Sequence, residues 1–556
     1  MTSPPKALVA VDIGAATTAV AVLGRPAGTW RLIGSLAAPG GVDAADVLEV
    51  LAARVGAADP ALADAIGLRP DAGGLRPGDG GLRPGALDAL PRLESRSAAP
   101  RTLAVIGASR RARTTLESIA ARTAWQVVGA STETHDPRET TELVLRDDVS
   151  AVLLAAGDPP GPDERASLDD LAGLVGAAAR RRPELQVVIG AAIRRRTAWL
   201  EGLGDDPPGD PERIVDAPAI GPRRHADEAL RATLEGLLAD PRSGRQALGA
   251  VASSLADLLE RRVEIVEVGH DGGARAVAGP GAPGDEPVGS SVVTARGALV
   301  PPEPDDLLVD QVLAWTTGSL DRHRMGDRLR DLRAAPWSDA AGEGARLRLA
   351  AARAALLRIA ALTPELGALP APDLTVVAGG CFAAVPPAAA MLAVADTMRR
   401  VGATQLAADP ARLLGPIGTI ADPVERRSLL ADVAGDLLVP LGSLVLAAGL
   451  GPRRDGGRIG SLDLEHDGSS VRHDLVTGDV ALLDLGPGTS ATASLEFREA
   501  ARIGRRTRRV SVAVSGGLGG LVVDLRDVPL RLPDRRDRRR SVLAAWSALA
   551  WPVDEP

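Results

Sequence analysis

The chain begins with three short apolar runs. They are "LVAVDIG", "TTAVAVLG" and "TWRLIGSL", within residues 8–36, and small residues and glycines separate them. Apolar runs with short turn-forming breaks are typical of consecutive antiparallel strands. "DAADVLEVLAARVGA" (43–57) then has apolar positions at helical spacing, which predicts an amphipathic helix after the strands.

The pattern changes twice in the next two hundred residues. "GLRP" recurs at 67, 74 and 81, and because each copy carries a proline, we interpret 59–100 as a Gly/Pro-rich linker. From 101 to 222, buried-strand patterns such as "TLAVIGA" and "VSAVLLAAG" alternate with helical ones. This alternation indicates an α/β insert with a parallel sheet.

The second half divides into a mainly helical part and a strand-rich end. Within 223–460, the strand-like "VEIVEVG" and "LTVVAGG" are separated by helical patterns, whereas 461–556 has mostly short alternating runs. We therefore expect a β-rich region at 461–556. We also expect a protein of two lobes, the first of which begins with residues 1–58.

Composition excludes several functions. The 556 residues carry a net charge of -8, with Lys6 as the only lysine, Cys381 as the only cysteine and no tyrosine. Lysine-dependent chemistry, disulfides within the chain and aromatic platforms for nucleic acid are therefore not expected. The sequence shows no signal-peptide pattern and no membrane span, and we expect a cytoplasmic protein.

The first two runs contain candidate chemistry. "VAVDIGAATTAVAVLG" (9–24) carries Asp12, Gly14, Thr17 and Thr18 around a turn of small residues. Backbone N–H groups and hydroxyls in such a turn can bind phosphate, and a carboxylate on the strand can hold a metal-bound water. A purely structural hairpin, with Asp12 capping the turn, is the alternative. The actin, Hsp70 and sugar-kinase superfamily begins its nucleotide site with this pattern.

That superfamily requires a second acid-bearing hairpin and a glycine pair that packs against adenosine. Gly379 and Gly380 end a predicted strand and fit the glycine pair. For the hairpin, 481–494 has better local chemistry but follows the glycine pair, so its order is wrong. Residues 263–278 have the right order and offer Glu267, Gly269 and Gly272, but Gly273, Ala274 and Arg275 replace the threonines.

The order of these blocks resembles the glutamate mutase L family, accessory proteins of the actin/Hsp70-like ATPase superfamily. The resemblance rests on the first hairpin, "VEIVEVGHDGG", "VLAWTTGSLDRHRMGDRLRDLRAAPW", "VVAGGCFAAVPPAAAMLAVADTM" and "VAVSGGLGGLVVDLRDVPLRLP". It implies an α/β, two-lobed actin/Hsp70-like (ribonuclease H-like) ATPase fold with the α/β insert and a C-terminal β-rich region. It also places 481–494 in that β-rich region, away from the phosphates.

The resemblance further implies a helper protein that binds ATP or ADP with Mg2+ and acts on a partner protein. The partner would be an adenosylcobalamin-dependent carbon-skeleton mutase, which the helper keeps active as a chaperone or reactivator. Asp12 and Glu267 would be the catalytic acids, with Asp12 also at the metal. Gly14, Thr17, Thr18, Gly269, Gly272, Gly379 and Gly380 would bind the nucleotide.

Two alternatives stay open. Because the second hairpin lacks hydroxyls, a pseudo-ATPase scaffold with little or no hydrolysis competes with a weak ATPase. A small-molecule kinase requires a substrate pocket with a catalytic base, for which the sequence offers no candidate. The sequence predicts nucleotide binding and leaves turnover open.

Overall fold

A computed structural model gives the structure of the chain. It describes all residues except 1–5, 67, 69–89, 98–100, 122, 124, 157–160, 191–213, 217–223, 239–242, 281–287, 297–298, 301–303, 339, 363–370, 451–455 and 552–556. The "GLRP" repeats therefore lie almost wholly outside the described residues. The chain forms two compact units, the first from residues 1–98, 241–291 and 297–556 and the second from 99–240 and 292–296.

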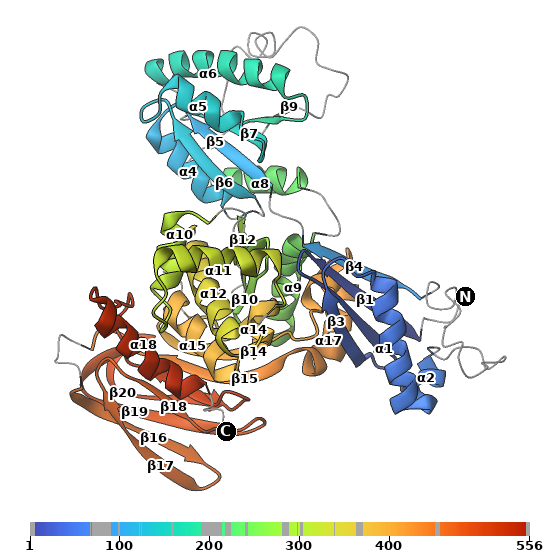
Figure 1. Cartoon of the computed structure of the whole chain (residues 1–556), viewed down its shortest axis with the longest axis vertical. Helices are drawn as coiled ribbons and strands as arrows, with labels where there is room; N and C mark the ends of the chain where they lie inside the picture. Colours follow the sequence, from blue (N-terminus) through green and yellow to red (C-terminus); the bar gives the residue numbers. More distant parts are fainter. Residues whose placement is uncertain are drawn as a thin grey trace. The chain divides into compact units, whose positions relative to one another are not determined.

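The first unit begins with a four-stranded sheet in the order β3-β2-β1-β4 (Figure 1). Its strands are β1 (Ala7–Gly14), β2 (Thr17–Gly24), β3 (Arg31–Pro39) and β4 (Arg92–Ser97). The first three pair antiparallel, as predicted, and β4 pairs parallel with β1. Helix α1 (Ala44–Ala58) packs its apolar face on this sheet, and Asp43 caps the N-terminus of the helix.

The linker interpretation of 59–100 is too broad. Helix α2 (Pro60–Ile66) and strand β4 both lie within it. Strand β4 reads "RLESRS" and has no apolar alternation, because pairing with β1 holds it in place. Hydrophobic periodicity could not reveal such a strand.

The second sheet repeats the arrangement of the first. Its eight strands have the order β12-β11-β10-β13-β14-β15-β21-β18. Their bounds are β10 (Val263–Val268), β11 (Gly272–Gly279), β12 (Val288–Arg296), β13 (Leu374–Ala378), β14 (Gly402–Ala408), β15 (Val439–Leu446), β18 (Val480–Leu483) and β21 (Leu521–Asp524). Again a hairpin, β10–β11, has a parallel strand, β13, on the far side of its first strand.

Two sheets that each carry a hairpin and a parallel neighbour of its first strand give the actin/Hsp70-like ATPase fold. The predicted fold class is confirmed. The helices of this unit include α9 (Gly244–Leu259), α10 (Asp306–Leu313), α11 (Arg322–Ala334), α12 (Gly342–Leu362), α14 (Gly380–Ala383), α15 (Pro387–Met398), α16 (Leu414–Gly418) and α17 (Pro423–Leu437). Helix α16 follows β14 yet contacts β1, β4 and α9, so it links the two sheets.

The C-terminal segment is β-rich but not a separate domain. Strands β16 (Arg458–His466), β17 (Ser469–Val476), β19 (Ser490–Ile503) and β20 (Arg505–Ser515) form an antiparallel sheet in the order β17-β16-β19-β20. Strands β18 and β21 instead extend the second sheet through β15. The boundary predicted at 461 therefore cuts through a continuous structure, which helix α18 (Arg536–Ala550) completes.

The second unit is the predicted α/β insert. Strands β5 (Thr102–Gly107), β6 (Gln126–Ser131), β7 (Val149–Ala155), β8 (Gln186–Ile189) and β9 (Ile214–Asp216) form a parallel sheet in the order β6-β5-β7-β8-β9. Its helices are α4 (Arg110–Ala120), α5 (Pro137–Val144), α6 (Pro162–Arg181) and α8 (Arg224–Gly236). The unit extends beyond the expected end at 222, because the buried Trp125 indole donates to Leu234 O of α8 at 2.8 Å.

Open parallel sheets usually bind ligands at the carboxyl ends of the strands where the strand order reverses, here at the ends of β5 and β7. That position is satisfied within this chain. Glu133 accepts from Arg110 N at 2.9 Å, and Glu164 accepts from Ser109 Oγ at 2.6 Å, so carboxylates already cover the N-terminus of α4. The chain's own carboxylates therefore occupy this end of the sheet.

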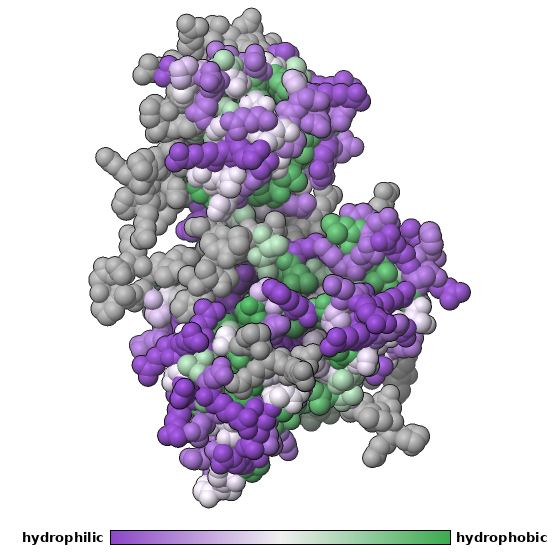
Figure 2. Space-filling view, turned by 90° about the vertical axis from the view of Figure 1, so that its left-hand side faces the viewer, coloured by the Kyte–Doolittle hydropathy of each residue, from purple (hydrophilic) through white to green (hydrophobic). Residues whose placement is uncertain are grey.

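Among the residues that Figure 2 colours, hydrophilic ones predominate on the face shown, with hydrophobic ones in patches between them. Among the described helices, none is long and apolar enough to cross a membrane.

Candidate functional site

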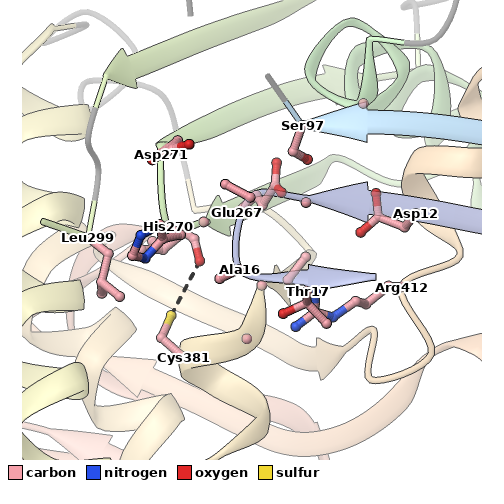
Figure 3. Close-up of a pocket in the computed structure, with 18 of the residues that line it drawn as sticks. Asp12, Ala16, Thr17, Ser97, Glu267, His270, Asp271, Leu299, Cys381 and Arg412 are labelled. Carbon is pink, nitrogen blue, oxygen red and sulfur yellow. Dashed lines mark hydrogen bonds between the residues drawn. The ribbon is translucent and has the colours of Figure 1, made fainter. Parts of the chain in front are cut away.

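One pocket in the first unit brings the two hairpins and the glycine pair together (Figure 3). Its lining includes, from the residues that the sequence pointed to, Asp12, Gly14, Thr17, Glu267, Gly269, Gly379 and Gly380. The hairpin turns thus converge from two different sheets. The cavity volume is about 90 Å3.

Asp12 lies near the end of β1, at the edge of this pocket. Its Oδ1 accepts a hydrogen bond from Ser95 Oγ at 2.7 Å, and Ser95 is fully buried on the parallel strand β4. A Cβ on Gly415 of α16 would lie 2.7 Å from that Ser95 hydroxyl. The position of the carboxylate therefore depends on β4, which the sequence did not reveal, and on a glycine that leaves it room.

The adjacent threonines of β2 have different positions, because successive side chains of a strand point to opposite faces. Thr17 lines the pocket, as Figure 3 shows. Thr18 is not among the lining residues, and its hydroxyl donates to Val42 O at 3.1 Å. The prediction that Thr18 binds phosphate is therefore not supported, since that hydroxyl supports the segment before α1.

The second hairpin contributes a carboxylate but no hydroxyl. Glu267 of β10 lines the pocket, whereas Gly272 lies outside the lining and its carbonyl accepts from Gly269 N at 2.8 Å, which closes the turn. Asp271 also lines the pocket, but it forms an ion pair with Arg333 at 2.7 Å. Burial and the Arg333 guanidinium lower the pKa of the neighbouring His270, so this imidazole is neutral at pH 7.

The glycine pair lies in the pocket, but contacts within the chain explain both glycines. Gly379 has a φ of +103°, and a Cβ there would lie 2.2 Å from Val268 O. A Cβ on Gly380 would lie 2.8 Å from Arg412 Nη2 and 3.1 Å from Trp337 Cη2. The first glycine allows β13 to approach β10, and the second leaves room for two side chains of this protein.

Cys381 follows the glycine pair and is buried, as expected for a small packing residue. Its thiol contacts Val268 O at 3.5 Å, and burial raises its pKa to about 12. A thiol that stays protonated at pH 7 is a poor nucleophile.

Two charged pocket residues were missed from the sequence, and both follow β14. Asp409 accepts from the backbone N–H groups of Leu413 and Leu414 at 3.1 and 2.9 Å. Its burial, with a smaller effect of the Asp12 charge, raises its pKa to about 6. Arg412 is half-buried with a φ of +55°, a conformation that is unfavourable for arginine.

Arg412 gives the pocket a cation suited to an anionic ligand. Among the described residues, its guanidinium enters no hydrogen bond or ion pair, and it lines the pocket (Figure 3). Arginine fits phosphate through paired N–H donors. Arg412 could therefore donate hydrogen bonds to an anionic ligand in this pocket.

No protein-family model and no curated protein matches this chain. Among solved structures, component A of (R)-2-hydroxyglutaryl-CoA dehydratase from Acidaminococcus fermentans aligns at 8% identity, over 76% of this chain and 98% of that chain, with a TM-score of 0.26. A PilM–PilN type IV pilus biogenesis complex aligns at 13% identity, over 76% and 98%, with a TM-score of 0.21.

A Ppx/GppA family member from Aquifex aeolicus aligns at 9% identity, over 70% of each chain, with a TM-score of 0.18. Likenesses this distant carry no residue role or activity over to this chain. The fold rests on the strand order and on the two hairpins described above. Membership of the glutamate mutase L family stays a prediction.

Proposed function

We propose that this chain is a nucleotide-binding accessory protein that binds ATP with Mg2+ and acts on a partner protein. The observation that carries the proposal is the convergence of two hairpin turns from two sheets on one pocket, with Asp12 and Glu267 as their acids. Phosphate would lie against the turn at 14–17, where backbone N–H groups and the Thr17 hydroxyl can donate. Arg412 would add charge-assisted hydrogen bonds.

The carboxylates present fit Mg2+ that arrives with the nucleotide. Among the described residues, no group of three His, Cys, Asp or Glu side chains could hold a metal ion by itself. Mg2+ is usually bound by one or two carboxylates together with waters and ligand phosphates. Asp12 is suited to this role, with Glu267 as the second acid, and the ion would neutralise phosphate charge.

The second hairpin supports binding more than rapid hydrolysis. It has no hydroxyl at the pocket, and Asp271 is already paired with Arg333. Each missing charge-assisted hydrogen bond removes roughly 1.5–3 kcal/mol of ligand stabilisation. We therefore propose a weak ATPase, and the same observation favours a pseudo-ATPase scaffold as the second candidate.

The proposed partner follows from the resemblance to the glutamate mutase L family. It is an adenosylcobalamin-dependent carbon-skeleton mutase, for which this chain would act as a chaperone or reactivator in the cytoplasm. Capture of partner proteins from the native host, with and without ATP, tests this role. Recovery of such a mutase in a nucleotide-dependent manner supports it, and identical recovery with and without ATP contradicts it.

Turnover distinguishes the two candidates. Phosphate release is measured with Mg2+ and ATP for the wild type, Asp12→Ala and Glu267→Ala. A weak ATPase loses turnover in both variants, because each acid serves the same phosphates. Turnover that disappears in Asp12→Ala but survives in Glu267→Ala contradicts the two-acid site, and no turnover in a wild type that binds ATP favours the scaffold.

A further inference from the structure

Trp337 reaches into the pocket from the turn that follows α11. Its indole Nε1–H donates to Ala16 O, in the turn of the first hairpin. The same carbonyl also accepts from Gly40 N at 2.9 Å. Trp337 therefore joins the helical part of the unit to the turn at which phosphate would bind.

The same indole covers the glycine pair. A Cβ on Gly380 would lie 3.1 Å from Trp337 Cη2 and 3.6 Å from Cζ2. The space that the missing side chain of Gly380 leaves is thus filled by this protein's own aromatic ring. The sequence predicts that adenosine packs against this glycine pair.

A buried arginine donates hydrogen bonds to the turn that carries Trp337. Arg348 of α12 is 3% exposed and donates from Nη2 to Ser338 O at 2.7 Å and from Nε to Pro336 O at 3.1 Å. These bonds fix the residues on both sides of Trp337. The indole position is therefore built into the fold.

The size of the pocket agrees with this arrangement. Its volume of about 90 Å3 has room for several water molecules. Trp337 is one of the residues that line this cavity, so its indole takes up space beside the glycine pair.

We infer that Trp337 determines whether the nucleoside part of a ligand can enter this site. The nucleoside binds after the indole leaves Ala16 O and Gly380, whereas phosphate groups bind without that movement. The inference rests on the proposed function, because it concerns the same pocket. Only the fraction of molecules with the indole displaced binds ATP fully, so the apparent affinity for ATP falls in proportion to that fraction.

Comparison of ATP with inorganic tripolyphosphate, both with Mg2+, tests the inference. Calorimetric titration gives the affinity of each ligand for the wild type, Trp337→Ala and Trp337→Phe. Trp30→Phe is the matched control, since Trp30 lies beyond the far end of β2 from the phosphate turn and stacks on Arg25 at 5.0 Å. Thermal unfolding confirms that each variant is folded.

Trp337→Ala is expected to bind ATP about tenfold more tightly than the wild type. This factor corresponds to about one wild-type molecule in ten having the indole displaced. Its affinity for tripolyphosphate should stay within about twofold of the wild type, because phosphate binding does not require that movement. Trp337→Phe, which keeps a ring but loses the N–H donor, should give an intermediate gain, and Trp30→Phe should give none.

Weaker ATP binding by Trp337→Ala with unchanged tripolyphosphate binding would show that the indole supports the nucleoside, and overturns the inference. Unchanged ATP binding by Trp337→Ala also overturns it. Neither of these results affects the proposed nucleotide site. Failure of both ligands to bind any variant overturns the proposed function itself and the inference with it.

Discussion

Thr17 and Thr18 are adjacent and equally buried, yet the structure gives them different roles. Each is 3% exposed, but Thr17 lines the pocket and Thr18 donates to Val42 O at 3.1 Å. Substitution by valine removes each hydroxyl and keeps the shape of the side chain. The two variants therefore separate a loss of binding from a loss of stability.

Thr17→Val is expected to weaken ATP binding and leave the fold intact. A hydrogen bond from a hydroxyl to a phosphate oxygen is worth roughly 1.5–3 kcal/mol, which corresponds to about 10- to 100-fold in the dissociation constant. Thr18→Val should instead reduce the free energy of unfolding by about 0.5–1.5 kcal/mol, because one neutral hydrogen bond is lost. Its ATP affinity should be unchanged.

Calorimetric titration with ATP and Mg2+ measures the first effect, and denaturant unfolding measures the second. Equal ATP affinity for Thr17→Val and the wild type would refute the placement of phosphate at this turn. Weaker binding by Thr18→Val at unchanged stability would refute the assignment of the two threonines to opposite faces.

Three further predictions concern residues at the edges of the pocket. Gly379→Ala should lower the free energy of unfolding by more than about 2 kcal/mol, measured with denaturant, because its Cβ would lie 2.2 Å from Val268 O at a φ of +103°; wild-type stability would contradict the close approach. Asp409 has a pKa raised to about 6, so the folded state holds its proton more tightly than the unfolded chain. Wild-type stability should therefore fall by about 1 kcal/mol between pH 5 and pH 7 relative to Asp409→Asn, and parallel pH profiles would exclude this titration. Arg412→Gln should weaken ATP and tripolyphosphate by a similar factor of about ten or more in titrations, whereas loss of ATP binding alone would place Arg412 at the nucleoside.

The parts of the fold with local sequence patterns were predictable. Both hairpins, the α/β insert and the glycine pair were found from apolar runs and small residues. Strand β4 was missed, because "RLESRS" has no apolar alternation and owes its conformation to pairing with β1. The insert boundary was missed because α8 belongs to it through tertiary contacts such as Trp125 to Leu234.

The site was predictable only in part, because its side chains come from distant segments. Sequence alone could not decide which of Thr17 and Thr18 faces the pocket, since a shift of one residue exchanges the faces of a strand. Trp337 and Ala16 are 321 positions apart, and no local pattern connects them. Asp409 and Arg412 occur in "AADPARLLG", which has no local pattern typical of a binding site. Both residues reach the pocket only because β14 ends there.

The central claim is that both hairpins serve one nucleotide site. Titration of ATP with Mg2+ into the wild type, Asp12→Ala and Glu267→Ala tests it most directly, with Asp484→Ala as a control from the excluded segment at 481–494. We expect saturable binding by the wild type and by Asp484→Ala, and binding weakened at least about tenfold in both other variants. No binding by the wild type at millimolar ATP, or wild-type affinity in Asp12→Ala and Glu267→Ala, would contradict it.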